Sequence, residues 1–138
     1  INGALINYSY VSQAPASDVY IKLANLPATS SGNYSGLLMR GLIGSWASAG
    51  KAAFTFYAGT RDANTFVWQV NAGTYGDKTS VGVRAYQKSD NSVDICLYCK
   101  ASTYVTFNCN IQGIQLTLYG TPASFTPTGT KVFDSSTV

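Results

Sequence analysis

The sequence predicts an all-β chain that folds as an antiparallel β-sandwich, jelly-roll-like, with about 8–10 short strands. Apolar and polar residues alternate along most of the chain, as expected for strands with one buried face. Val81, Val83 and Ala85, for example, share one face of a run whose other face carries Arg84 and Tyr86. The runs are rich in β-branched and aromatic residues. Short groups of Gly, Ser, Asn and Asp separate them at intervals of about 8–12 residues, which is typical of a sandwich.

The strands are expected at residues 4–11, 18–26, 37–43, 51–58, 66–71, 81–88, 93–99, 105–111 and 115–119. The clearest signal spans residues 81–111, where three alternating runs with two short breaks predict an antiparallel three-stranded meander. Gly41 interrupts an apolar run and permits a bulge or a close backbone approach. From Gly120 onward, Pro, Gly and Thr predominate, so this tail can hardly build a central strand. We expect it to lie extended over the domain or over a neighbouring chain.

Length and composition indicate one domain. The 138 residues suffice for a single core, with N-terminal strands and a loop in 1–36, the main sandwich in 37–119 and the extended tail in 120–138. Charged residues make up 11% of the chain, against about 25% in typical soluble domains. A surface so poor in charge indicates either a neutral polar skin or coverage by identical copies. For the second case we expect a homo-oligomer with Leu5, Ile6 and Tyr8 near the symmetry axis.

Several functional classes are disfavoured. The net charge of +3 is small and scattered, which argues against nucleic acid as a partner, and no run of about 18 apolar residues indicates membrane insertion. The chain lacks His and Glu, and its six acidic residues, all Asp, fall at strand edges or turns, where they are expected to form turns. No phosphate-binding loop occurs. We therefore expect no enzyme, no catalytic residue and no cofactor; a hydrolase that uses an Asp pair stays as an alternative.

The three cysteines are predicted to be buried, reduced thiols. Cys96 and Cys99 are three residues apart, so they should lie on opposite faces of one strand. Cys109 is expected opposite Ile95 in the meander, away from both. This arrangement offers no metal site, because the sulfurs do not converge and a fourth ligand is missing. Reduced thiols favour folding in a reducing cytosol.

Recognition of a ligand fits the loops better than catalysis does. Three loops combine an aromatic ring or a charged pair with planar hydrogen-bonding groups, which is what sugars need from a binding site. Trp68 lies in the middle of a run and is expected in the core. The predicted ligand-binding residues are Trp46, Arg61, Asp62, Asn64, Tyr75 and Asp77.

The segments LLMRGLIGSW, FYAGTRD, VWQV and VGVRAYQKSDNSVDICLYCKA together resemble the C-terminal domains of bacteriophage tail fibres and tailspikes. The resemblance spans residues 37–119. In that family the corresponding turn often carries Asp-Gly, whereas here it is Asp90-Asn91-Ser92. The family has no shared binding motif that maps onto residues of this chain.

The resemblance implies a β-sandwich head on a homotrimeric stalk, assembled in the host cytoplasm and located at the tail-fibre tip of the virion. Such a lectin-like head would attach the particle to a bacterial surface polysaccharide or an outer-membrane protein. Two alternatives remain open. One is a carbohydrate-binding module of a polysaccharide-degrading enzyme, and the other is a fibre-tip domain that only trimerises.

Overall fold

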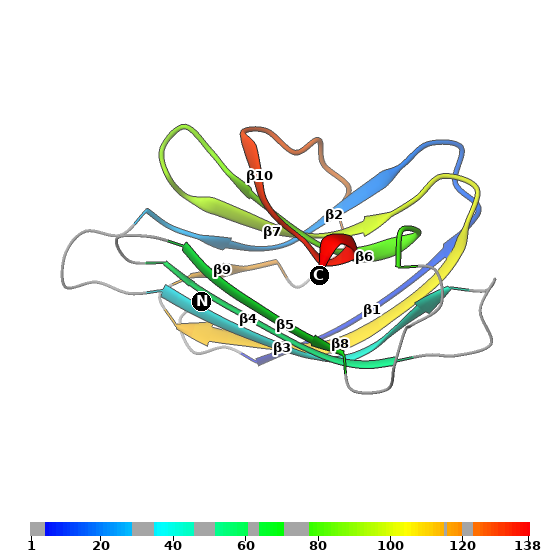
Figure 1. Ribbon diagram of the computed structural model, residues 1–138, viewed down its shortest axis with the longest axis horizontal. Coiled ribbons are helices and arrows are strands. Elements are labelled where there is room, and N and C mark those ends of the chain that lie inside the picture. The colour runs from blue at the N-terminus through cyan, green and yellow to red at the C-terminus, as the bar shows by residue number, and fades with distance from the viewer. Residues whose placement is uncertain are drawn as a thin grey trace.

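The computed structural model describes residues 5–28, 35–45, 52–60, 64–70, 78–114, 116–119 and 123–138, without the side chains of Leu5 and Asn64. Two five-stranded antiparallel sheets pack face to face (Figure 1), which confirms the predicted all-β sandwich. Sheet A has the order β1 (Leu5–Gln13), β8 (Tyr104–Ile114), β3 (Ser35–Ser45), β4 (Ala52–Thr60), β5 (Asn64–Val70). Sheet B has the order β10 (Thr130–Asp134), β6 (Val81–Gln87), β7 (Val93–Cys99), β2 (Val19–Leu26), β9 (Thr117–Leu118). A short 3₁₀ turn, Ser135–Thr137, follows β10.

The core lies between the sheets and is built from alternate residues of each strand. β4 shows the pattern clearly, because Phe54 and Phe56 are buried while Tyr57 between Phe56 and Ala58 is exposed. Each large side chain buried in this way contributes about 1.5–3 kcal/mol. Trp68 packs partly buried against the core and stacks on Phe54 at 5.3 Å between ring centroids, as its position in the run predicts.

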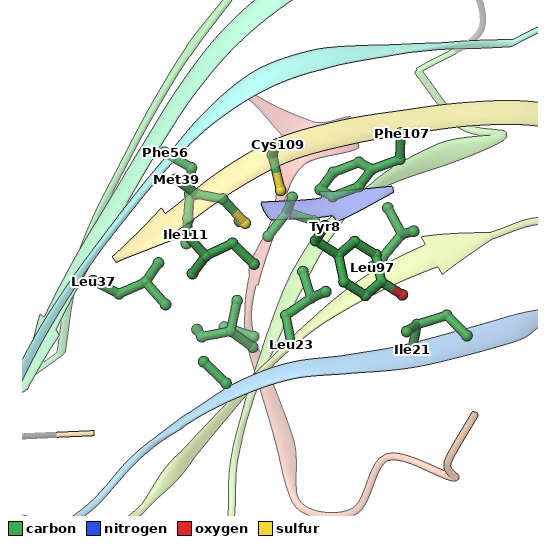
Figure 2. Packing of buried hydrophobic residues seen from close by; sticks show 14 of the residues in the cluster. Tyr8, Ile21, Leu23, Leu37, Met39, Phe56, Leu97, Phe107, Cys109 and Ile111 are labelled. Carbon is green, nitrogen blue, oxygen red and sulfur yellow. The ribbon is translucent and has the colours of Figure 1, made fainter. Parts of the chain in front are cut away.

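Tyr8 belongs to this core and not to an outer contact. Its side chain is 2% exposed and reaches from β1 toward Ile21 of β2 across the interior (Figure 2). The expectation that Tyr8 faces a symmetry axis is therefore wrong. The reason is one of parity: Tyr8 shares its face of β1 with the buried Ser12, whereas Asn7, Ser9 and Val11 point outward.

The predicted three-stranded meander is only partly correct. β6 and β7 form the expected hairpin, with Asn91 in the left-handed region (φ 69°) and Asp90 accepting from the Ser92 amide at 2.9 Å. β8, however, crosses to sheet A and pairs with β1 and β3. Both edges of β7 are already occupied, by β6 and by β2, so no edge is left for β8. Cys109 consequently lies opposite Tyr8 and Gly41 instead of Ile95.

Two connections in which the chain passes from one sheet to the other lie side by side at the right of Figure 1. Backbone hydrogen bonds join them. The Ala14 amide donates to the Thr103 carbonyl at 2.9 Å, and the Ser102 amide donates to the Pro15 carbonyl at 2.8 Å. Ala14 and Ser102 both have positive φ, 52° and 61°. These bonds join the β1–β2 connection to the β7–β8 connection, so the chain changes sheet twice at the same corner.

Bulges in β2 and β10 decide which residues share the outer face of sheet B. Pairing with the neighbouring strand shifts between Lys22 and Ala24 in β2 and between Lys131 and Phe133 in β10. A bulge inserts one residue and reverses the alternation beyond it. Lys131 and Asp134 therefore meet on one face although they are three residues apart. β10 is an edge strand, in keeping with the expectation that the tail would not build a central strand.

The three cysteines are free and buried, as predicted. Cys99 and Cys109 belong to the core between the sheets, whereas Cys96 faces the opposite side of β7 from Cys99. Burial raises the pKa of each thiol to about 12. At neutral pH these side chains are small apolar groups.

Candidate functional site

The outer faces of the two sheets differ in chemistry. Within the strands of sheet A the charged side chain is Arg40, and this sheet carries most of the large exposed hydrophobics among the described residues: Val11, Leu42, Tyr57, Tyr104 and Ile114. The strands of sheet B carry Lys22, Arg84, Asp94, Lys131 and Asp134. Ion pairs found in the described part of the chain all involve the outer face of sheet B. This face also holds tyrosines, so it is the candidate site.

Strand register arranges the face in rows across the sheet. One row runs Asn25, Asp94, Tyr86, Lys131; the next runs Lys22, Cys96, Arg84, Asp134; a third contains Tyr20 and Tyr98. Every residue of β7 is buried, including those on this outer side. In Figure 1 the strands of sheet B dip toward sheet A at their middle, so the outer face is concave along the strands.

The side chains of this face form two groups, and Arg84 is at the centre of the first. Its guanidinium carbon lies 3.7 Å above the Tyr98 ring, and its Nη1 donates to the Tyr20 hydroxyl at 3.3 Å. Tyr20 in turn packs against Tyr98 at 5.3 Å and edge-on against Tyr86 at 6.3 Å between centroids. The arginine thus joins three rings that come from three strands. A flat cation beside tyrosine edges can offer both hydrogen-bond donors and ring surface to a polar ligand.

Asp134 neutralises this arginine from the edge strand. Its Oδ2 lies 3.3 Å from Arg84 Nε and 2.7 Å from Lys131 Nζ. The Arg84 Nε contact is an ion pair without hydrogen-bond geometry. Burial acts to raise the pKa of Asp134, but hydrogen bonds from Lys131 and Ser136 together with the charge of Arg84 outweigh it and lower the pKa. An open hollow of about 270 Å³ adjoins this pair, lined by Lys131, Val132, Phe133, Asp134, Thr137 and Val138.

Tyr86 and Tyr98 on this face stay protonated at neutral pH, because the pKa of each is raised. Burial, followed by the charge of Asp18, raises the pKa of Tyr98 to about 12. Its hydroxyl donates to Asp18 Oδ2 at 3.2 Å, while the other Asp18 oxygen accepts from the Ala101 amide at 2.9 Å. Burial also raises the pKa of Tyr86, although Arg84 opposes the shift. The rings therefore present neutral hydroxyl groups.

Asp94 is the centre of the second group. Its side chain is 3% exposed, and its Oδ1 accepts from the Asn25 amide nitrogen at 2.8 Å. Its Oδ2 lies 3.8 Å from Lys22 Nζ and 3.9 Å from Lys88 Nζ. The Lys22 ammonium also lies over the Tyr119 and Phe125 rings, 5.4 and 4.8 Å from their centroids.

The aspartates therefore do more than form turns. Asp90 is the expected turn residue, since its carboxylate accepts from both the amide and the hydroxyl of Ser92. Asp94 instead lies within a strand as a buried partner of cations, which corrects the expectation for this residue. Asp134 ends β10 and accepts from the Ser136 amide in the following 3₁₀ turn, as expected, but it is also a buried partner of cations. Alternation could not reveal this, because each pairs with cations from other strands or across a bulge.

The side chains of the loop residues predicted to bind a ligand all lie outside the described part of the chain. Trp46, Arg61, Asp62, Tyr75 and Asp77 lie outside the described residues, and of Asn64 only the backbone, at the start of β5, is described. The strand ends that flank residues 46–51 and 71–77 are at one end of sheet A. Those that flank residues 61–63 are at the other, because Ile43 pairs with Ala52 and Ser35 with Thr60.

The sequence contains a signal for part of the observed site. Arg84 and Tyr86 alternate with buried residues, which places them on an outer face. Tyr20, Tyr98 and Asp134 lie next to them because the sheet order is β10-β6-β7-β2. Alternation does not encode this order.

Within the described residues, no group of three or more Cys, Asp, Glu or His side chains could hold a metal ion. In the same residues no helix is long and apolar enough to cross a membrane.

The chain is thus a two-sheet antiparallel β-sandwich. The outer face of sheet A is nearly neutral, and the outer face of sheet B carries charged residues and tyrosines. No family model matches the chain, and no curated protein matches its sequence. Among solved structures, it is similar to WceF of Pantoea stewartii, described as a glycan biofilm modifying enzyme with a bacteriophage tailspike-like parallel beta-helix fold. The similarity has a TM-score of 0.51 at 10% identity and covers 93% of this chain but 21% of the WceF chain. The chain thus spans about a fifth of that protein, and the likeness concerns the fold alone.

Proposed function

We propose that this chain is the receptor-binding head domain of a phage tail fibre or tailspike, which attaches the particle to a bacterial surface glycan or outer-membrane component. The observation that carries the proposal is the outer face of sheet B, where tyrosine rings adjoin guanidinium, ammonium and carboxylate groups. Sugars bind through ring faces and through paired hydrogen-bonding groups. The fold similarity to part of WceF, which is described as tailspike-like, also supports this proposal.

The homotrimer forms part of this proposal. The outer face of sheet A supports it, since its strands carry Arg40 as their charged residue and several exposed apolar side chains. A nearly neutral face can meet an identical copy without charge repulsion, whereas the face of sheet B carries an excess of cations. In the assembly the charged face would stay free for the receptor, and the particle would carry the domain at its fibre tip.

A carbohydrate-binding module is the second candidate function, and the fold comparison favours it. WceF is described as a glycan biofilm modifying enzyme, and this chain corresponds to 21% of its length. A carbohydrate-binding module within a larger glycan-modifying enzyme would have these proportions. Oligomeric state separates the two proposals, because an appended module is expected as a monomer.

A glycan array with the intact chain, combined with adsorption to whole bacteria, tests recognition directly. Tyr86→Ala removes a partly exposed ring from the face of sheet B, and we expect about tenfold weaker retention, equivalent to about 1.4 kcal/mol. Tyr57→Ala removes an exposed ring from sheet A and is the matched control. Trp46→Ala and Tyr75→Ala test the predicted loops in the same assay. Retention that none of these substitutions alters would contradict recognition through the face of sheet B and through the loops. Absence of retention, both on the array and on cells, would contradict glycan recognition and leave a domain that only trimerises.

A further inference from the structure

We propose that the ligand of this face is an acidic glycan and that Lys22 and Lys88 bind one of its carboxylates beside Asp94. The inference rests on the proposed glycan-binding function and narrows its ligand class. The starting observation is the charge balance of the face. Four cations, Lys22, Arg84, Lys88 and Lys131, surround two carboxylates, Asp94 and Asp134. Each buried carboxylate has two cationic partners although one would neutralise it.

The geometry around Asp94 leaves hydrogen-bonding capacity on both lysines. Their ammonium nitrogens lie 3.8 and 3.9 Å from the same oxygen, Asp94 Oδ2, and both distances exceed a hydrogen bond. The other oxygen is satisfied by Asn25. The lysine side chains are 27% and 32% exposed, while Asp94 is 3% exposed. The carboxylate is thus enclosed, and the ammonium groups are open to a second acceptor.

The two ammonium groups also repel each other. Because both lie within 4 Å of one oxygen, they are at most about 8 Å apart, and like charges at this separation interact unfavourably in a partly desolvated setting. Asp94 offsets only one of them. A ligand carboxylate between the two would compensate the second charge and receive charge-assisted hydrogen bonds from both.

The other charged residues within the strands of sheet B are already paired with one another. Lys131 and Arg84 are paired with Asp134. At the two ends of the sheet, Asp90 accepts from Ser92 and Asp18 from Ala101 and Tyr98. Among the four cations around Asp94 and Asp134, Lys22 and Lys88 therefore have the loosest contacts to a carboxylate.

A ring next to the lysine pair favours a sugar acid over a simple anion. Tyr86 is the register partner of Asp94, on the same outer face, and its side chain is partly exposed. A uronic acid residue could place its ring against Tyr86 and its carboxylate between the ammonium groups. A neutral sugar would leave one of the two ammonium charges without a compensating anion.

The test measures binding of the intact chain to polygalacturonate and to the same polymer with its carboxyl groups reduced to alcohols. We expect the acidic polymer to bind at least about tenfold more tightly. Lys22→Gln and Lys88→Gln should each weaken binding to the acidic polymer by about tenfold, the value of one charge-assisted hydrogen bond. Each single variant keeps one ammonium and Asn25 beside Asp94, so folding is expected to persist. Arg40→Gln, which removes the same charge from sheet A, should change the affinity by less than about twofold.

Asp94→Asn gives a prediction of opposite sign. It removes the internal anion that competes for the ammonium groups, so binding to polygalacturonate should tighten even if the melting temperature falls. A merely structural role for Asp94 would weaken binding or leave it unchanged.

Each other outcome has a defined meaning. Equal affinity for both polymers, unaffected by the lysine variants, would overturn the inference and leave glycan recognition standing. Poly-glutamate binding as tightly as polygalacturonate would also overturn it, because charge alone would then suffice. Failure to bind either polymer overturns the inference too, and the glycan array then decides separately whether the proposed function fails with it.

Discussion

Gly41→Ala should destabilise this protein far more than Gly36→Ala, although both glycines lie in β3. A Cβ atom at Gly41 would overlap the carbonyl oxygen of Asn108 and lie 2.6 Å from Cys109 Cα, both in the backbone of β8. A Cβ atom at Gly36 would meet Ile114 Cγ1 at 3.8 Å, an ordinary contact. The pair therefore compares the same substitution with and without a backbone obstacle.

The magnitude follows from what must move. Overpacking against side chains costs about 1–3 kcal/mol, and here the obstacle is backbone within the β3–β8 pairing, which cannot rotate away. We expect Gly41→Ala to lower the free energy of unfolding by about 3 kcal/mol or more. Gly36→Ala should change it by less than about 1 kcal/mol, and toward higher stability, because alanine restricts the unfolded chain.

Urea unfolding followed by tryptophan fluorescence measures both values. With a slope of about 2 kcal/mol per molar, the midpoint of Gly41→Ala should fall by about 1.5 M. If the free energies of unfolding of the two variants agree within about 0.5 kcal/mol, then β3 and β8 are not paired in the register described.

Three further predictions concern the site, the thiols and the assembly. Arg84→Gln should lower the free energy of unfolding by about 2 kcal/mol, since it removes the stack on Tyr98 while Lys131 still neutralises Asp134; chemical denaturation checks this, and a loss below 0.5 kcal/mol would contradict it. The cysteines should not react with a disulfide reagent at pH 8 until the protein unfolds, because burial raises the pKa of each thiol to about 12. Since these pKa values lie above the unfolded value of about 8.5, the thiols favour the folded state at low pH and stability should fall as pH rises from about 9 to 12; a flat pH profile over that range would be the contrary result. Light scattering at micromolar concentration should give the mass of three chains, and Leu42→Glu on the outer face of sheet A should reduce it; a monomer in the parent chain would refute the trimer.

Local features of the fold were predictable because they depend on neighbouring residues. Alternation located the strands, and the break between β6 and β7 contains Asp90 and Asn91, residue types that tolerate the left-handed geometry that Asn91 adopts. Gly41 was expected to allow a close backbone approach, and it does so against β8. These properties follow from side-chain period and backbone sterics alone.

Pairing between distant strands was not predictable in the same way. The run 105–111 alternates equally well in a meander or in a crossing strand, and the outcome depends on β2 occupying the free edge of β7. Tyr8 was misplaced because an aromatic residue near the N-terminus can serve a core or an interface.

The candidate site depends on the same long-range information. The sequence pattern predicts that Arg84 and Tyr86 point outward. It does not predict the bulge that brings Lys131 and Asp134 to the same face. The loop residues from Trp46 to Asp77 stay predictions.

Nuclear magnetic resonance of the isotope-labelled chain, titrated with a glycan that the array identifies, tests the central claim most directly. The account predicts that the amide shifts that change are those of Tyr20, Lys22, Arg84, Tyr86 and Asp94, on the outer face of sheet B, while those around Arg40 on sheet A stay fixed. Changes that map to sheet A, with the face of sheet B unaffected, would contradict it.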